Sequence, residues 1–351
     1  MDYFLYFCIP NFMMEMRRLM ISGMLLMAMT VSAEPENDTL PLFEGEVNTE
    51  VNYGLHKHIR HPVMWDFPHI VASATLNLGK GWRVEAEMEY ERFHQNGVWG
   101  NKFRGDYATN HLALTKEMRL GGDLSLTVSA GIVPIPVGIT NSGGPALTIY
   151  DPASEAAVMP MTWHDGGLVV GLRTGRWQLL AGTYVYGRTP LRESRMAGAA
   201  ARADCLLPVG LRLGASCFYG NTYAGMLSLQ DDADEGRRHE LCVAFDADFA
   251  KGGFVADGSV VHTRAHGKSA YGVEAGYNVL RSVWPAVGLT PFVRYDGGFV
   301  GSGPDFNRLT VGMNLAPWGG LILKVEYAWQ HDDGSRAQGA YNLSVGYGMR
   351  F

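Results

Sequence analysis

The chain has 351 residues, of which 47% are hydrophobic and 18% are charged, and its formal net charge is −6. Its 15 Phe, 16 Tyr and 8 Trp provide ample surface for burial, which excludes a disordered chain, and the acidic balance argues against a nucleic-acid partner. The 44 glycines exceed the usual share of about 7%, and together with the aromatic residues they favour an all-β fold.

The only continuous apolar run lies near the N-terminus. Two arginines precede an apolar core of residues 19–31, and small residues follow it up to Ala33. These features are typical of a secretory signal peptide, and the run is shorter than the roughly 18 residues that a transmembrane helix needs. We therefore expect a signal peptide over 1–33, with Met16 as an alternative start, and a short N-terminal segment over 34–42.

Residues 82–91 alternate strictly between two classes of side chain. Apolar side chains occupy one set of positions and charged side chains the other, as Trp82, Val84, Ala86, Met88 and Tyr90 against Arg83, Glu85, Glu87, Glu89 and Glu91. The same period of two recurs over residues 43–54. A helix would mix both sets on every face, so the pattern predicts strands with one apolar and one polar face.

The alternation continues along the chain and predicts strands of about ten residues, the length of a tilted strand that crosses a bilayer. We expect sixteen, over residues 43–54, 69–78, 82–93, 107–119, 123–132, 165–173, 176–186, 197–206, 210–219, 238–250, 253–264, 268–279, 289–296, 305–315, 321–330 and 340–351. Residues 43–351 are therefore expected to form a transmembrane antiparallel β-barrel. Pro291 removes a backbone donor from one strand, and we expect a bulge there.

The expected connections alternate between tight turns and long loops, as membrane barrels require. The third long loop, residues 133–164, is the longest and contains no Lys or Arg. In a barrel of this size such a loop can fold inward, and a long structureless segment in a compact protein is usually functional. Its carboxylates Asp151 and Glu155 are our candidates for a pore constriction. The alternative is that both are solvated loop carboxylates.

The polar face of each predicted strand is assigned to the barrel interior, which gives charged candidates for the lumen wall. Acids come early in the chain and bases later: Glu44, Glu46, Glu50, Glu85, Glu87 and Glu89, then Arg173, Arg202, Arg212, Arg294, Arg308, Lys324 and Arg350. Opposed acidic and basic walls would create a transverse field that orients dipolar solutes. The alternative is local ion pairing between neighbouring strands, and the sequence does not decide between them.

The last predicted strand ends the chain at Phe351. A terminal Phe on an alternating strand resembles the recognition signal of bacterial outer-membrane barrels. We therefore expect Phe351 to be a barrel-assembly signal that the barrel-assembly machinery reads. Outer-membrane lipid is expected around the barrel, which would reach the bacterial outer membrane after secretion through the inner membrane.

Common motifs of catalytic, nucleotide and metal sites are absent. The sequence contains no CxxC, Walker loop, GxSxG or HExxH. Three cysteines follow the expected signal peptide; Cys205 and Cys217 flank one turn and could pair, but we interpret all three as wall residues. His56, His58 and His61 could bind a metal, although solvated loop histidines are the simpler interpretation. We expect no enzymatic activity, no cofactor and no metal site.

Two stretches of the third loop resemble a known family. Residues 133–141 (VPIPVGITN) and 160–167 (PMTWHDGG) look like the third-loop region of the phosphate-selective porin O and P-like family. With the strand pattern and Phe351, the resemblance implies an outer-membrane diffusion channel that forms a homotrimer. Anion selectivity in that family is associated with lysines that line the constriction, and the matching loop here has none. Phosphate is therefore not carried over as a substrate.

Barrel size links the expected fold to a function. Eight strands leave an interior that side chains fill, whereas about sixteen enclose a water-filled channel. We therefore expect an outer-membrane porin for passive diffusion of small hydrophilic solutes or ions, narrowed by residues 133–164. The alternatives are a non-conducting barrel that acts as an adhesin or structural protein, and an outer-membrane barrel enzyme.

Overall fold

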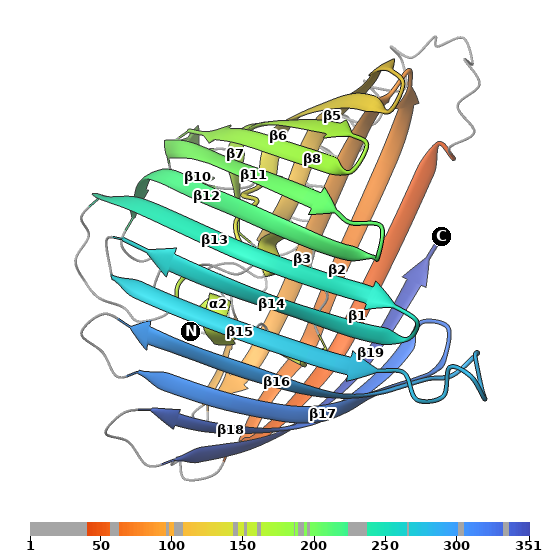
Figure 1. Ribbon diagram of the computed structural model, residues 1–351, viewed down its shortest axis with the longest axis vertical. Coiled ribbons are helices and arrows are strands. Elements are labelled where there is room, and N and C mark those ends of the chain that lie inside the picture. The colour runs from red at the N-terminus through yellow and green to blue at the C-terminus, as the bar shows by residue number, and fades with distance from the viewer. Residues whose placement is uncertain are drawn as a thin grey trace, which may run out of the picture.

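The computed structural model is an all-β molecule whose strands form a ring (Figure 1). It describes residues 41–56, 63–95, 98–101, 108–142, 147–150, 153–159, 163–185, 187–188, 193–194, 197–223, 237–264, 267–300, 305–332 and 337–351. The expected signal peptide over 1–33 lies outside these residues. None of the described helices is both long enough and apolar enough to cross a membrane.

Sixteen long strands form a closed antiparallel barrel. They are β1 Phe43–His56, β2 Val63–Gly79, β3 Trp82–Gln95, β5 Ala108–Gly121, β6 Leu124–Pro134, β7 His164–Thr174, β8 Trp177–Tyr184, β11 Ala197–Leu206, β12 Leu211–Tyr223, β13 Arg237–Lys251, β14 Phe254–Thr263, β15 Lys268–Tyr277, β16 Gly288–Val300, β17 Phe306–Trp318, β18 Leu321–Asp332 and β19 Gln338–Arg350. The short β4 (Val98–Asn101) pairs with β3, and β9 (Gly187–Arg188) pairs only with β10 (Glu193–Ser194). The predicted fold class and all sixteen predicted strands are therefore confirmed.

The two ends of the sheet meet where β1 pairs with β19. Gly45 and Phe351 exchange both backbone hydrogen bonds, at 2.8 and 2.9 Å. The rings of Phe43 and Phe351 lie beside this seam, with centroids 6.1 Å apart. Closure leaves no free sheet edge, which removes the site at which other chains could pair. Phe351 thus completes the seam, and its role as an assembly signal stays a prediction.

Alternate side chains of each strand point to opposite sides of the barrel wall. On β19, Asn342 and Ser344 are buried within, whereas Tyr341, Leu343 and Val345 are exposed on the outer surface. The outer face of the other strands carries exposed Val, Leu, Tyr and Phe in the same way. An apolar exterior around a polar interior is typical of barrels that cross a lipid bilayer.

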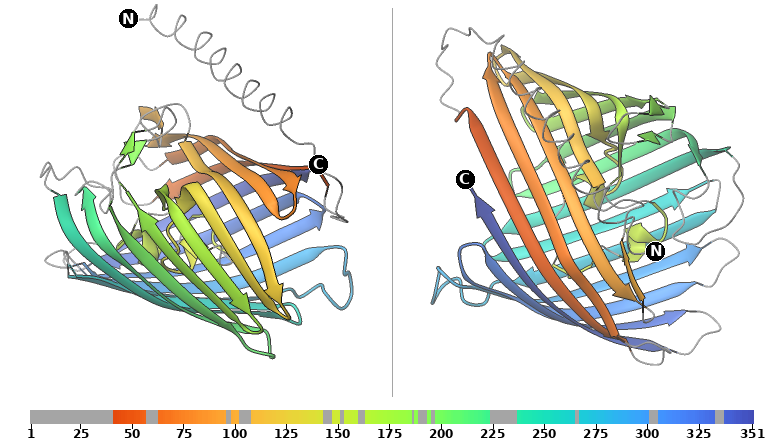
Figure 2. Two further views of the ribbon diagram at one scale, coloured as in Figure 1. Left: turned by 90° about the horizontal axis from the view of Figure 1, so that it is seen from above. Right: turned by 180° about the vertical axis from the view of Figure 1, so that it is seen from behind.

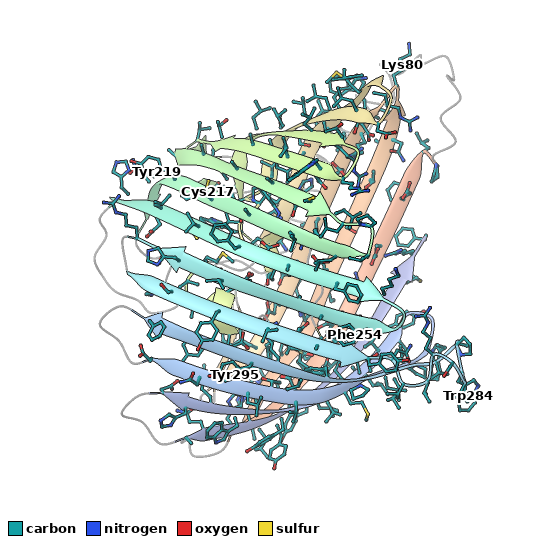
Figure 3. All side chains as sticks on the ribbon, viewed as in Figure 1. Lys80, Cys217, Tyr219, Phe254, Trp284 and Tyr295 are labelled. Atoms are coloured by element: carbon teal, nitrogen blue, oxygen red, sulfur yellow. The ribbon has the colours of Figure 1, made fainter. Side chains whose placement is uncertain are left out.

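Exposed aromatic side chains lie toward both ends of the strands (Figure 3). Tyr219 lies at the end that carries the long loops, whereas Phe254 and Trp284 lie at the end that carries the tight turns. Aromatic rings with one polar edge favour the boundary between hydrocarbon and water. Their position is consistent with two aromatic girdles.

Proline is accommodated in β16 without the bulge that we predicted. The register with β17 runs unbroken from Gly288↔Ala316 to Gly298↔Phe306, and Pro291 pairs with Met313. The pairing of β16 with β15 ends at Phe292, one residue after the proline. On that side, the missing N–H of Pro291 breaks no ladder hydrogen bond, so a bulge is not needed.

The turn between β17 and β18 offers a matched test of the fold. Gly320 has a φ of +86°, and a Cβ there would clash with the carbonyl oxygen of Gly348, whereas a Cβ on Gly319 would meet nothing within 4 Å. We expect Gly320→Ala to lower the free energy of unfolding by about 1–3 kcal/mol because it combines backbone strain with a clash. Gly319→Ala is expected to stay within about 0.5 kcal/mol of wild type. Urea unfolding in lipid vesicles measures both, and equal losses would contradict the turn geometry.

Candidate functional site

A loop that we call the inner loop, residues 135–163, connects β6 to β7. It carries a 3₁₀ turn, η1 (Thr140–Ser142), and a four-residue helix, α2 (Ala153–Ala156). Figure 1 and both views of Figure 2 show α2 within the ring of strands. Helix α2 contacts β14, β15 and β16. The inner loop therefore occupies part of the barrel interior.

An apolar cluster fastens both ends of the inner loop to the wall. Ile135 and Val137 are fully buried in it, and the rings of Trp163 and Phe218 lie 5.0 Å apart. Its other members are Ala113, Val133, Val158, Met159, Tyr184, Ala200, Cys242, Ala244, Val261 and Ala270. The small wall residues leave room for the larger loop side chains, whose burial stabilises the inward position of the loop. Cys205, Cys217 and Cys242 are free thiols.

Glu155 holds the inner loop together from within. Its carboxylate is fully buried; Oε1 accepts the N–H of Ile139 at 2.8 Å, and Oε2 accepts the N–H of Thr140 at 3.0 Å. These donors lie at the start of η1, where backbone N–H groups lack partners within the turn. An eyelet acid must face the water of a pore, so this burial contradicts our prediction for Glu155. The second candidate, Asp151, lies outside the described residues.

A buried arginine on β11 ties the first part of the inner loop to the wall. The Arg202 Nη2 atom lies 2.8 Å from Asp204 Oδ1 and 2.7 Å from Asp246 Oδ1. Its Nη1 donates to the carbonyl oxygen of Gly138 at 3.1 Å, and the N–H of Gly138 donates to Ser216 Oγ at 3.1 Å. Two carboxylates thus orient the guanidinium so that it can hold a loop carbonyl. We call this group the Arg202 clamp.

A second buried arginine, on β16, holds α2. The Arg294 Nε atom lies 2.9 Å from Asp296 Oδ2, and its Nη1 lies 3.3 Å from Glu274 and 3.4 Å from Asp257. Ser154 donates to Asp296 Oδ1 through its hydroxyl at 2.7 Å and through its N–H at 3.3 Å. We call this group the Arg294 clamp. It fixes the helix against β16 through charge-assisted hydrogen bonds.

Each clamp faces a glycine on a neighbouring strand. A Cβ at Gly272 would lie 2.6 Å from both Arg294 Nη2 and Ser154 Oγ, and a Cβ at Gly214 would clash with Arg202. Both clamps also share one sequence pattern, an arginine two residues before an aspartate on the same strand. Positions two apart on a strand share a face, so the pattern places both charges in the interior.

The middle of the inner loop runs across the inner face of the later strands. The N–H of Leu147 donates to Glu274 Oε1 at 2.8 Å, and the N–H of Ile149 donates to Glu326 Oε2 at 3.0 Å. Lys324 Nζ donates to the carbonyl oxygen of Thr148 at 2.8 Å. The wall candidate Lys324 therefore binds the loop backbone, and wall side chains take over hydrogen bonds that the irregular loop lacks.

Tyr150 follows this segment and lies within reach of charges from both sides of the barrel. Burial raises the pKa of its phenol above the ordinary value, and the charges of Asp66, Glu326 and Glu91 raise that pKa further, whereas Arg308 lowers it. Asp66 and Glu91 belong to β2 and β3, whereas Glu326 and Arg308 belong to β18 and β17. The inner loop therefore reaches from the late strands toward the early ones and narrows the interior.

Basic wall candidates on the later strands pair with nearby acids. Arg212 Nη1 lies 2.6 Å from Asp204 Oδ1, and its Nη2 pairs with Asp248. Arg350 Nε lies 2.8 Å from Glu46 Oε2 across the β1–β19 seam. With the two clamps, these pairs favour local ion pairing over a basic wall that faces an acidic one.

The inner faces of β2 and β3 keep a net negative charge among the described residues. Glu85 lies 3.0 Å from Arg83 and accepts the Thr115 hydroxyl at 2.6 Å. Glu89 accepts the Asn110 amide at 2.6 Å. Amides and hydroxyls satisfy hydrogen bonds without neutralising charge, so this wall attracts cations.

The remaining wall candidates share the inward positions of their strands but do not join the clamps. Glu44 accepts the Asn77 amide at 3.5 Å, and Glu50 accepts the Asn52 amide at 3.5 Å. The Asn110 amide donates to Glu87 at 3.4 Å. Arg173 is exposed at the end of β7, and Arg308 is half-buried on β17.

Sequence reasoning missed the acids that complete the clamps and the loop residues that they hold. Ser154, Asp204, Asp246 and Asp296 carry these contacts. The arginine-x-aspartate pattern on two predicted strands was a usable signal for the clamps. No comparable signal marked Tyr150, because its environment depends on how the loop folds.

No family model matches the chain, and no curated protein sequence matches it. Solved structures of outer-membrane proteins do resemble it. OmpF of Salmonella typhi, solved in complex with daunomycin, aligns with a TM-score of 0.64 and 11% identity over 88% of this chain and 97% of that chain. A loop L8 deletion mutant of OmpT, an outer membrane protein of Vibrio cholerae, aligns with a TM-score of 0.58 and 10% identity over 88% of this chain and 98% of that chain.

The trimer form of Vibrio cholerae OmpT aligns with a TM-score of 0.56 and 11% identity, over 88% of this chain and 98% of that chain. At such low identities the likeness concerns the fold alone. It covers nearly the whole length of each known structure, including the order in which the strands close the ring. The chain therefore has the barrel fold of these outer-membrane proteins.

Proposed function

We propose that the protein is an outer-membrane porin, a water-filled channel through which small hydrophilic solutes or ions diffuse passively. The observation that carries this proposal is the inner loop, which two buried arginine clamps fasten inside a sixteen-strand barrel. Side chains alone do not fill a barrel of this size, so a loop fixed in the interior sets the width of the remaining passage. A membrane location is supported by the apolar exterior and by the fold shared with OmpF and OmpT.

Uptake of neutral solutes tests this proposal. Liposomes that contain the refolded protein should swell in sugar solutions, with a rate that falls steeply as the sugar becomes larger. The size dependence follows from a passage narrowed by the inner loop. An adhesin or structural barrel predicts no swelling with any sugar, and that result would remove the porin function.

The charge pattern of the interior supports a preference for cations. Acids on β3 lack cationic partners in proportion, and bases on the later strands are paired with acids. We expect the double change Glu85→Gln and Glu87→Gln to lower the cation-to-anion permeability ratio, because it removes negative charge beside the passage.

Reversal potentials under a salt gradient measure that ratio. Asp123→Asn is the matched control, because Asp123 is an exposed acid in the turn between β5 and β6. The control should leave the reversal potential unchanged. An equal shift in both variants would show that the β3 acids do not act within the passage.

Assembly and targeting complete the proposal. A trimer form is known for Vibrio cholerae OmpT, and we propose a homotrimer here. The signal peptide over 1–33, recognition of the C-terminal strand by the assembly machinery and the absence of enzymatic activity are parts of the same proposal. The loop resemblance supports a relationship to the phosphate-selective porin O and P-like family, without phosphate as the solute.

A further inference from the structure

We propose that His69, Glu89 and Glu91 form a binding site for a divalent transition metal such as Zn²⁺ on the inner wall, beside the inner loop. One ligand atom from each of these residues lies within 4.8 Å of the others. His69 Nε2 and Glu89 Oε1 are 3.3 Å apart, close to the roughly 3.4 Å that separates two ligands around tetrahedral zinc. One imidazole and two carboxylates favour zinc over magnesium or calcium, which prefer oxygen ligands alone.

A bulge in β2 brings these residues together. The register with β3 shifts between Asp66 and His69, so both side chains point inward although they are three positions apart. Without the bulge, residues three apart on a strand would face opposite sides of the wall. His69 pairs directly with Glu91 on β3, and Glu89 lies on the same inner face two residues away.

The surroundings of His69 match those of a metal-binding imidazole. Its Nδ1 lies 3.6 Å from Asp66 Oδ2 and 3.9 Å from Glu50 Oε2. A carboxylate beside one ring nitrogen orients a metal-binding histidine and directs the lone pair of the other nitrogen toward the metal. His69 therefore presents Nε2 to Glu89, with Asp66 behind it.

A second observation points to a missing ligand at this position. Asp66 and Asn52 are more than nine-tenths buried, and one carboxylate oxygen and the amide oxygen of these side chains have no hydrogen-bond partner among the described residues. The Asn52 amide donates to the other oxygen of Asp66 at 2.9 Å. Buried oxygens without donors are costly, and a bound cation with its water shell would supply what they lack.

The position of the site gives the metal a consequence for transport. Tyr150 of the inner loop lies close enough to Asp66 and Glu91 for both charges to act on its phenol. A metal on His69, Glu89 and Glu91 would therefore sit where the loop approaches the β2–β3 wall. It would neutralise acids beside the passage and narrow the space, so zinc should reduce the conductance. This consequence rests on the proposed porin function, whereas the binding itself does not.

Calorimetric titration of ZnCl₂ into the refolded full-length protein in detergent tests the site directly. We expect one saturable zinc site and no comparable heat with MgCl₂. His69→Gln and Glu91→Gln should each weaken zinc binding by more than about tenfold, because each removes a ligand. Glu87→Gln, which removes the same charge from the same face of β3, should leave the affinity unchanged. Two ligand variants are used so that one with impaired folding does not decide the outcome.

Several results would overturn the site. No zinc heat, equal binding of zinc and magnesium, or an equal loss in Glu87→Gln would each show that the acids attract cations only diffusely. Conductance recordings with and without zinc separate the two proposals. Zinc binding by a protein that does not conduct would support the site and remove the porin function. Conducting channels that bind no zinc would support the porin and remove the site.

Discussion

Replacing Arg294 with alanine is expected to lower the free energy of unfolding by about 3–5 kcal/mol, because three buried carboxylates lose their shared cation. The change also frees α2, since Arg294 orients the aspartate that accepts both donors of Ser154. Urea unfolding in lipid vesicles, followed by tryptophan fluorescence, measures the loss.

Arg350→Ala is the control for this prediction. Arg350 also pairs with a carboxylate, but its side chain is 84% exposed at the end of β19. Exposed ion pairs contribute little, so the control should change the unfolding free energy by less than about 1 kcal/mol. Similar losses in both variants would contradict the structural role of the Arg294 clamp.

Replacing Glu155 with alanine is expected to widen the passage. The change leaves the N–H groups of Ile139 and Thr140 without acceptors in a buried site, which costs about 1–3 kcal/mol for each donor. The inner loop should then leave its inward position more often. We expect a larger single-channel conductance and faster liposome swelling with large sugars, whereas the barrel itself should still fold.

The conservative change Glu155→Gln distinguishes a structural role from an electrostatic one. Glutamine removes the charge but keeps one acceptor oxygen, so it should widen the passage less than alanine does. If Glu155 were an eyelet acid in contact with pore water, both variants would shift the charge selectivity equally. Equal selectivity shifts at unchanged conductance would restore the eyelet role.

The barrel was predictable because its cause is local. Alternation such as that of residues 82–91 requires only that one face of a strand meets an apolar phase and the other a polar one. The same logic gave the inward positions of Arg202 and Arg294. Local alternation did not decide whether these arginines face the passage or a nearby carboxylate, because that depends on which strands are neighbours and in which register.

The inner loop could not be predicted in detail, because its contacts join residues far apart in the chain. Glu155 was expected to face the passage because it is an acid in a long loop, yet the turn at Ile139 takes both of its oxygens. His69 was grouped with the loop histidines, but β2 begins at Val63, six residues before the predicted start. A bulge cannot be read from period-two alternation, so the inward pairing of Asp66 with His69 was not visible.

Current through single molecules in a planar lipid bilayer, recorded under a KCl gradient, tests the central claim most directly. A porin narrowed by the inner loop beside an acidic wall predicts discrete, long-lived conductance steps with a reversal potential on the cation-selective side. The absence of steps from correctly folded protein would contradict the channel. Steps with an anion-selective reversal potential would contradict the assignment of the net negative β2–β3 wall to the passage.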